Sequence, residues 1–324
     1  MAKSEFKFDW HSRQAKHMIV FAVLGLVALY VILPQLLGFS SFRKSSLPLH
    51  WQGTYLAAGI FGLTFVVAAA SFMILAFNRI SFFRTLLIQF ASVPLNMLLP
   101  AGIGNMGVNF MYLRHQKHTP MRAGMVVSAN NLIGVIGNLA VLIALFFIFG
   151  FSDTQLSLYW HYTYLIILAV VVLVVLVVIS FKLLGSHIEH VRDFKRQMFN
   201  ALHNYSQRPL SFVGALLCAV MQALLYVLAF WYCLQAYGIQ LSFPTAFLVF
   251  SLSVVVRTSV PTPGGLGGVE ASLVAGILAS HASNLSLALA AVLAFRLITF
   301  WLPLLTGAVA LLIVERAKLL SPTG

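Results

Sequence analysis

Charged residues are scarce in this chain of 324 residues: they make up 8% of it, whereas hydrophobic residues make up 60%. An ordinary soluble domain has roughly 25% charged residues, so this chain carries too little charge to cover a water-exposed surface. Its apolar residues come in long runs, and the alternating segments of roughly ten residues that form barrel strands are missing. The composition therefore predicts an all-α polytopic membrane protein and excludes a soluble domain.

Recognisable catalytic motifs are also missing, since the chain has no H-E-x-x-H, G-x-S-x-G or Walker A sequence. Its two cysteines, Cys218 and Cys233, lie on one predicted helix about 22 Å apart, too far to bridge, and match no metal-ligand spacing. The segment GIGNMG at 102–107 fits a dinucleotide fingerprint only formally, because no strand precedes it. We expect no enzyme activity, no cofactor and no metal ion.

Long apolar segments are what the chain does contain. A helix crosses a hydrocarbon core of about 30 Å with roughly 20 apolar residues. Two further apolar stretches, 84–113 and 246–280, are interrupted near their middle by Pro and Gly. We expect a single transmembrane domain over 1–324, with six spanning helices near 18–38, 54–77, 122–150, 163–182, 209–237 and 285–314.

The basic residues indicate the orientation of this domain. If the amino terminus is inside and each interrupted stretch enters and leaves on one side, most of the 20 Lys and Arg residues fall in cytoplasmic segments. A large group of them lies in or beside the predicted cytoplasmic loop 183–208. We therefore place both termini in the cytoplasm. The net charge of +13 then reflects membrane topology, and we expect no nucleic-acid partner.

The two interrupted stretches resemble each other. PAGIG at 100–104 recurs as PGGLG at 263–267, and the elements on either side occur in the same order. The sequence thus predicts a first repeat over 18–150 and a second over 163–314. Each repeat has three crossings and one broken re-entrant helix pair, and the odd number of crossings inverts the second repeat. Such interruptions at matching positions are typical of a transporter's central site, although two kinked spanning helices are the alternative.

Three charged residues, Arg257, Glu270 and Arg296, fall inside predicted membrane segments. Charges at this depth are costly and favour a functional role. Glu270 can pair with one arginine, and the amino ends of the returning half-helices add partial positive charge, so we predict an anion site near the midplane. A purely structural triad is the alternative. The other predicted substrate-binding residues are Pro263, Gly264, Gly265, Gly267, Asn96, Pro100, Gly102, Gly104, Asn130 and Asn131. For the three asparagines helix packing is the alternative, and we interpret Gln222 as a helix-packing residue.

Two further segments resemble a known family. PTPGGLGGVEA at 261–271 and AFRLITFWLP at 294–303, with PLN at 94–96 and LPAGIG at 99–104, are similar to the flippase-like membrane proteins. That family is related to the transmembrane domain of lysylphosphatidylglycerol synthase (phosphatidylglycerol lysyltransferase). The resemblance covers about 54–316. It implies a lipid-translocating domain of the bacterial cytoplasmic (inner) membrane without the aminoacyl-transferase domain. Asn105 and Met106 stand where the family often has a charged residue, which moves the expected charged site to the second half.

The leading hypothesis for function is therefore a flippase or transporter of an anionic phospholipid or lipid-linked head group, working by alternating access around a midplane site. A transporter of a small anionic solute is the second hypothesis. The third is a non-transporting scaffold for a lipid-modifying enzyme. The expected partners are membrane lipid and, under this third hypothesis, a lipid-synthesising enzyme. The sequence predicts no particular oligomeric state.

Overall fold

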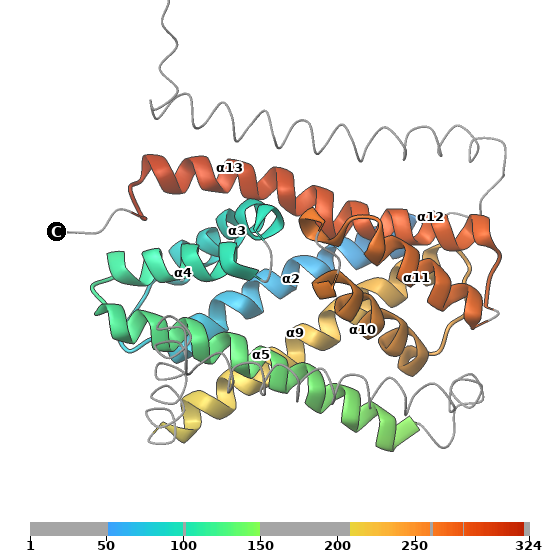
Figure 1. Cartoon of the computed structure of the whole chain (residues 1–324), viewed down its shortest axis with the longest axis horizontal. Coiled ribbons are helices and arrows are strands. Elements are labelled where there is room, and N and C mark those ends of the chain that lie inside the picture. The colour runs from blue at the N-terminus through green and yellow to red at the C-terminus, as the bar shows by residue number, and fades with distance from the viewer. Residues whose placement is uncertain (1–50, 100–101, 150–207, 260–261, 281, 321–324) are drawn as a thin grey trace, which may run out of the picture. The chain divides into compact units, whose positions relative to one another are not determined.

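The computed structural model describes residues 51–99, 102–149, 208–259, 262–280 and 282–320 (Figure 1). Every regular element within these residues is a helix, which confirms the predicted helical class. The predicted spans near 18–38 and 163–182 lie outside the described residues, as does the loop 183–208 apart from its last residue.

Four of the six predicted spans fall within the described residues. Helices α2 (Trp51–Leu75), α5 (Pro120–Phe149) and α9 (Pro209–Ala236) are each long and apolar enough to cross a membrane. The fourth candidate span is Leu285–Arg316, which comprises α12 (Leu285–Arg296), η3 (Leu297–Trp301) and α13 (Leu302–Arg316). Large apolar side chains on these helices are exposed, Leu210 and Leu305 among them, as expected for a surface that faces lipid. The chain is an integral membrane protein.

The first interrupted stretch forms two helices, α3 (Phe82–Leu98) and α4 (Ile103–His115), which pack against each other. A continuous α-helix would separate Leu95 from Gly104 by roughly 13 Å. Instead, a Cβ atom added at Gly104 would overlap the backbone of Leu95 and Asn96. The chain therefore doubles back between the two helices, which is not the geometry of a single kinked helix.

The second interrupted stretch repeats this arrangement with α10 (Phe243–Ser259) and α11 (Gly268–Ala279), joined through the short helix η2 (Pro263–Gly265). Helices α10 and α11 pack side by side, and a Cβ atom at Gly276 would come within 2.6 Å of the Val249 side chain. The helix η2 contacts α3, so the break of the second interrupted stretch lies against a helix of the first stretch. The α4–α5 and α11–α12 turns lie at opposite ends of Figure 1.

Helix α2 is the second span of the first predicted repeat, and α9 is the second span of the second. The two helices lie side by side and antiparallel along their length, because the start of α2 packs on the end of α9 and the start of α9 on the end of α2. Small residues allow this approach, since Gly53 of α2 faces Ala236 of α9. Helix α9 also approaches α5 closely, where Ala219 of α9 faces Gly137 of α5. Membrane helices commonly associate through such small residues, since lipid offers no hydrophobic driving force.

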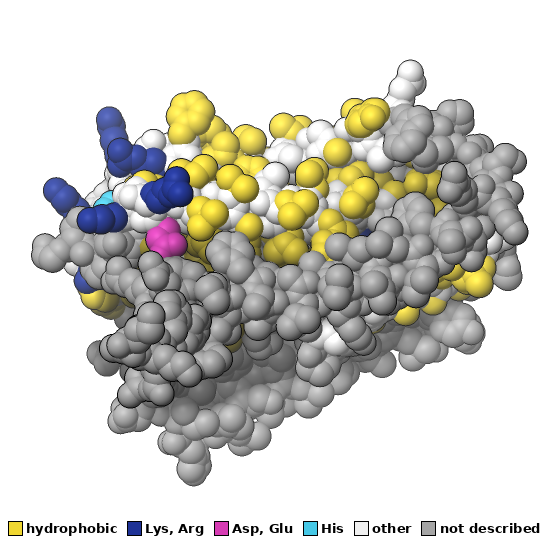
Figure 2. Space-filling model, turned by 90° about the horizontal axis from the view of Figure 1, so that it is seen from above, with side chains coloured by type: hydrophobic (Ala, Val, Ile, Leu, Met, Phe, Trp, Pro, Cys, Tyr) yellow, Lys and Arg dark blue, Asp and Glu magenta, His cyan; other side chains and the backbone are white. Residues whose placement is uncertain are grey.

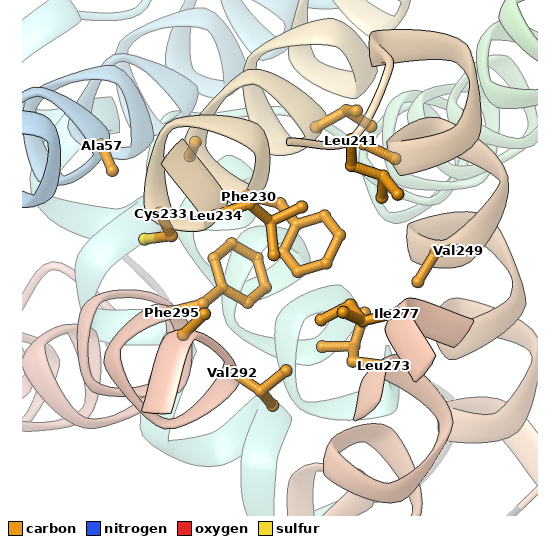
Figure 3. Packing of buried hydrophobic residues seen from close by; sticks show 14 of the residues in the cluster. Ala57, Phe230, Cys233, Leu234, Leu241, Val249, Leu273, Ile277, Val292 and Phe295 are labelled. Carbon is orange, nitrogen blue, oxygen red and sulfur yellow. The ribbon is translucent and has the colours of Figure 1, made fainter. Parts of the chain in front are cut away.

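One apolar core joins α9 to the second interrupted stretch and α12 (Figure 3). Phe230 of α9 meets Phe295 of α12 edge-to-face, with ring centroids 5.1 Å apart. Leu273 and Ile277 of α11 are fully buried in the same cluster. This packing holds α11 and α12 together beside α9, which fixes the relative positions of Glu270 and Arg296.

The end of the molecule that carries the α4–α5 turn is basic, and we call it the basic end. Figure 2 shows most visible Lys and Arg side chains gathered at one end of the face it presents. The guanidinium groups of Arg122 and Arg208 both lie near the Phe77 ring, 5.6 and 5.0 Å from its centre. His118 is buried in the turn and its Nε2 accepts a hydrogen bond from the Asn78 backbone N–H at 3.2 Å. Burial lowers the pKa of this imidazole, which keeps Nε2 available as an acceptor.

Candidate functional site

The second break is built from glycines in the left-handed region. Gly264, Gly265 and Gly267 have φ angles of 64°, 70° and 82°, which side chains with a Cβ adopt only with strain. Gly265 also lies against Arg257, since an added Cβ would come within 2.8 Å of the Arg257 Cγ. These glycines therefore allow the chain to turn closely around the last turn of α10, where Arg257 is placed.

Glu270 joins two elements with its two carboxylate oxygens. One oxygen accepts a hydrogen bond from the Gly267 N–H at 2.7 Å and thereby caps the amino end of α11. The other accepts from Nε of Arg296 on α12, at 2.6 Å. The Arg296 and Glu270 side chains are only 7% and 16% exposed. The ion pair therefore fastens the start of α11 to α12 in a largely buried setting.

Arg296 makes two more contacts around the break. Its Nη2 donates to the carbonyl oxygen of Gly264 at 3.3 Å, and its guanidinium lies over the Phe300 ring, 4.7 Å from the centre. Gly264 itself packs against the same ring. Arg296 thus holds the glycine turn, the aromatic ring and Glu270 in one cluster.

A π-helical turn, η3, follows Arg296 directly, whereas the sequence predicts an uninterrupted helix over 285–314. The signal for this difference is Pro303, whose missing N–H leaves a carbonyl one turn earlier without its usual helical partner. Such turns re-aim the side chains around them and are frequent at functional sites. The turn places Phe300 under the Arg296 guanidinium.

A cavity of about 130 Å³ lies beside this cluster, and we call it the arginine cavity. Arg257 and Arg296 both line it. Arg257 is exposed and has no carboxylate within ion-pair distance among the described residues. Asn96 lines the cavity from α3, and its buried Oδ1 accepts no hydrogen bond from the described protein groups. The other lining residues are Phe61, Phe65, Val93, Met97, Tyr226, Phe250, Ser253, Val254, Val269, Phe295, Thr299 and Pro303.

A second cavity, of about 200 Å³, contains no ionisable residue in its described lining, and we call it the amide cavity. Its lining residues are Ala68, Ser71, Phe72, Gln89, Asn105, Asn130, Asn131, Gly134, Ala219 and Gln222. Asn96, Asn130 and Asn131 are all predicted substrate-binding residues of the first half. The structure places them in two cavities, since Asn96 lines the arginine cavity and the other two line the amide cavity.

The remaining predicted site residues shape the backbone of the breaks. Gly102 precedes α4 with a φ of 76°, and Gly104 provides the close approach to α3. Pro263 begins η2, whereas Pro100 lies outside the described residues. Gln222, interpreted from the sequence as a helix-packing residue, lines the amide cavity.

The model of one protein family, described as the lysylphosphatidylglycerol synthase TM region, matches residues 18–307. The chain belongs to this family. The match includes both breaks and every described residue that lines the two cavities. Among curated proteins, a search found no match to the chain. Membership of the family relates the protein to the metabolism or transport of membrane lipids.

The Glu270–Arg296 pair predicts a difference in stability between two single variants. Glu270→Gln removes the carboxylate and leaves a buried guanidinium without a counter-charge, which costs on the order of 3–5 kcal/mol when one partner of a buried pair is lost. Arg257→Gln removes a charge of the same kind that has no carboxylate partner. Thermal denaturation of the purified protein in detergent should therefore show a clearly lower melting temperature for Glu270→Gln only. Equal melting temperatures for the two variants would contradict the structural role of the pair.

Proposed function

We propose that this protein carries the phosphate-bearing head group of an anionic lipid across the membrane while the acyl chains stay in the bilayer. The observation that carries the proposal is Arg257, which lines the arginine cavity without a carboxylate partner among the described residues. An unpaired charge inside a membrane costs about 2.5–3.5 kcal/mol on insertion scales. A bound anion offsets this cost, so the cavity favours a negatively charged ligand.

In this proposal Arg257 and Arg296 have different roles. Arg296 is committed to Glu270 through Nε and to Gly264 through Nη2, whereas Arg257 is free to contact a ligand. Arg296 still lines the cavity, and its Nη1 has no hydrogen-bond partner among the described residues. Guanidinium groups bind phosphate oxygens through strong charge-assisted hydrogen bonds. The arrangement therefore supports one primary phosphate contact at Arg257 and a second at Arg296.

The size and walls of the arginine cavity also fit this ligand. Its volume of about 130 Å³ is close to the ~150 Å³ cavity that holds benzene in a well-studied protein. That space accommodates a phosphodiester group but not acyl chains. Phenylalanine rings and other apolar side chains form most of the wall. These groups suit the junction between a phosphate and the apolar part of a lipid.

For the movement itself, we propose the inverted-repeat arrangement of the sequence analysis. Each interrupted stretch doubles back, the break of one contacts the other, and the two turns lie at opposite ends of Figure 1. This geometry supports two re-entrant pairs that enter from opposite faces and meet near the midplane. Rocking of one repeat against the other would open the arginine cavity to each face in turn. The basic end faces the cytoplasm in this arrangement.

The transport proposal predicts a strong effect of Arg257→Gln on lipid movement. Loss of a charge-assisted hydrogen bond of about 1.5–3 kcal/mol should slow translocation about tenfold or more. The measurement is the movement of fluorescent phosphatidylglycerol between leaflets of liposomes that contain the purified protein. Arg257→Lys should recover part of the rate because it keeps the charge. Arg316→Gln, which removes an exposed arginine at the end of α13, should behave like the wild type.

A wild-type rate for Arg257→Gln would refute the assignment of the phosphate site. Liposomes in which the wild-type protein moves no anionic lipid, but does move a small anion such as inorganic phosphate, would favour a solute transporter instead.

The re-entrant proposal predicts that the two turns face opposite sides of the membrane. Lys117→Cys in the α4–α5 turn and Ser283→Cys in the α11–α12 turn would be made separately, each in a chain with Cys218→Ala and Cys233→Ala. A membrane-impermeant maleimide applied to spheroplasts should label position 283 directly and position 117 only after lysis. Labelling of both positions from the same side would rule out the inverted arrangement.

A further inference from the structure

The amide cavity has open hydrogen-bonding groups of both kinds. Asn130 accepts from the Ser71 hydroxyl at 2.8 Å through Oδ1, and its Nδ2 has no partner among the described residues. Asn131 donates to the Val127 carbonyl oxygen at 3.0 Å, which leaves its Oδ1 open. Gln222 makes no hydrogen bond with a described residue. The cavity therefore presents free donors beside free acceptors.

Helices α3 and α4 add to this set. Gln89 donates to Asn109 Oδ1 at 2.9 Å and keeps its own Oε1 free. Asn105 accepts from Asn109 Nδ2 at 2.8 Å and keeps its Nδ2 free. The buried Asn109 thus fixes the orientation of two cavity residues without lining the cavity itself. Supporting hydrogen bonds of this kind hold the polar groups of a binding site in the orientation that a ligand needs.

The absence of charge in the described lining restricts the ligand. A phosphate or an ammonium group here would have no counter-charge, and a charge buried without one is costly. A hydroxyl group is both donor and acceptor, so it can satisfy a free amide N–H and a free amide oxygen together. The volume of about 200 Å³ leaves room for several hydroxyl groups on one small skeleton.

The amide cavity lies next to the arginine cavity. On α9, Gln222 lines the first and Tyr226 the second, and on α3 the corresponding residues are Gln89 and Val93. Each step is four residues, about 6 Å along the helix axis. Phe65, which lines the arginine cavity from α2, stacks on Phe90 of α3, with ring centroids 4.1 Å apart.

We infer that the amide cavity is a second binding site, for the uncharged, hydroxyl-bearing part of a lipid head group such as a glycerol, an inositol or a sugar. This inference rests on the proposed function and narrows it. The arginine cavity recognises the phosphate that all anionic phospholipids share. The amide cavity selects among those lipids by what the phosphate carries, and it disfavours head groups that end in an ammonium group.

The test compares fluorescent phosphatidylglycerol with fluorescent phosphatidylserine in the liposome assay, because both carry one net negative charge and only the second has an ammonium group. The wild-type protein should move phosphatidylglycerol faster. Asn131→Leu should lower this rate about three- to tenfold, the factor that one net hydrogen bond contributes, and should leave the phosphatidylserine rate unchanged. Asn131→Asp, which adds a negative charge to the cavity, should shift the preference toward phosphatidylserine. The matched control is Asn138→Leu on the same helix, at an exposed position outside the cavity lining.

Two results for Asn131→Leu would overturn the inference. Equal losses in the translocation rates of both lipids would indicate a structural role for Asn131. No change in either rate would indicate that the amide cavity is only a water-filled space. Failure of the proposed function is recognised separately, because the wild-type protein would then move neither lipid. Native mass spectrometry would decide the inference in that case. A ratio of retained phosphatidylglycerol to phosphatidylserine that falls in Asn131→Leu supports the second site, and an unchanged ratio refutes it.

Discussion

The ion pair between Glu270 and Arg296 is the interaction on which the rest of the candidate site depends. It connects the capped start of α11 to α12, and Arg296 in turn holds the carbonyl of the glycine turn and covers the Phe300 ring. Both members are largely buried. Neither charge could remain at this depth alone without a cost of a few kcal/mol. By neutralising Arg296, Glu270 leaves Arg257 as the cation available to a ligand.

The two cavities of the proposed carrier differ in the chemistry of their linings. One combines two guanidinium groups with aromatic walls, and the other combines amides with no charge in its described lining. The breaks make both possible, because Gly104 and Gly265 allow helices to approach more closely than a Cβ would permit. A phosphate and its hydroxylated substituent would then be recognised at neighbouring levels of the same helices.

Much of the architecture could be predicted from the sequence, because its determinants are local. Long apolar runs gave the spans found as α2, α5 and α9, and Pro and Gly marked both interruptions. The resemblance of the segments around Gly265 and Arg296 identified the family that the chain belongs to. The glycine turn was also foreseeable, since only glycine adopts three nearby left-handed conformations readily.

The division of the polar residues could not be predicted, because it depends on tertiary packing. Asn96 of α3 and Asn130 of α5 have the same chemistry, and only the packing of the helices shows that they line different cavities. Gln222 looked like a helix-packing residue because spacing along α9 does not reveal a space beside it. The π turn after Arg296 was missed for a related reason: Pro303 removes one hydrogen bond, but it does not specify how the helix adjusts.

The central claim is that the arginine cavity holds the phosphate of a lipid. The most direct measurement is an electron cryo-microscopy structure of the protein in nanodiscs made with phosphatidylglycerol, compared with Arg257→Gln in the same nanodiscs. The account predicts head-group density within hydrogen-bonding distance of Arg257 in the wild-type protein and its loss in the variant. A cavity without head-group density, with Arg257 paired to a carboxylate of the chain, would contradict it.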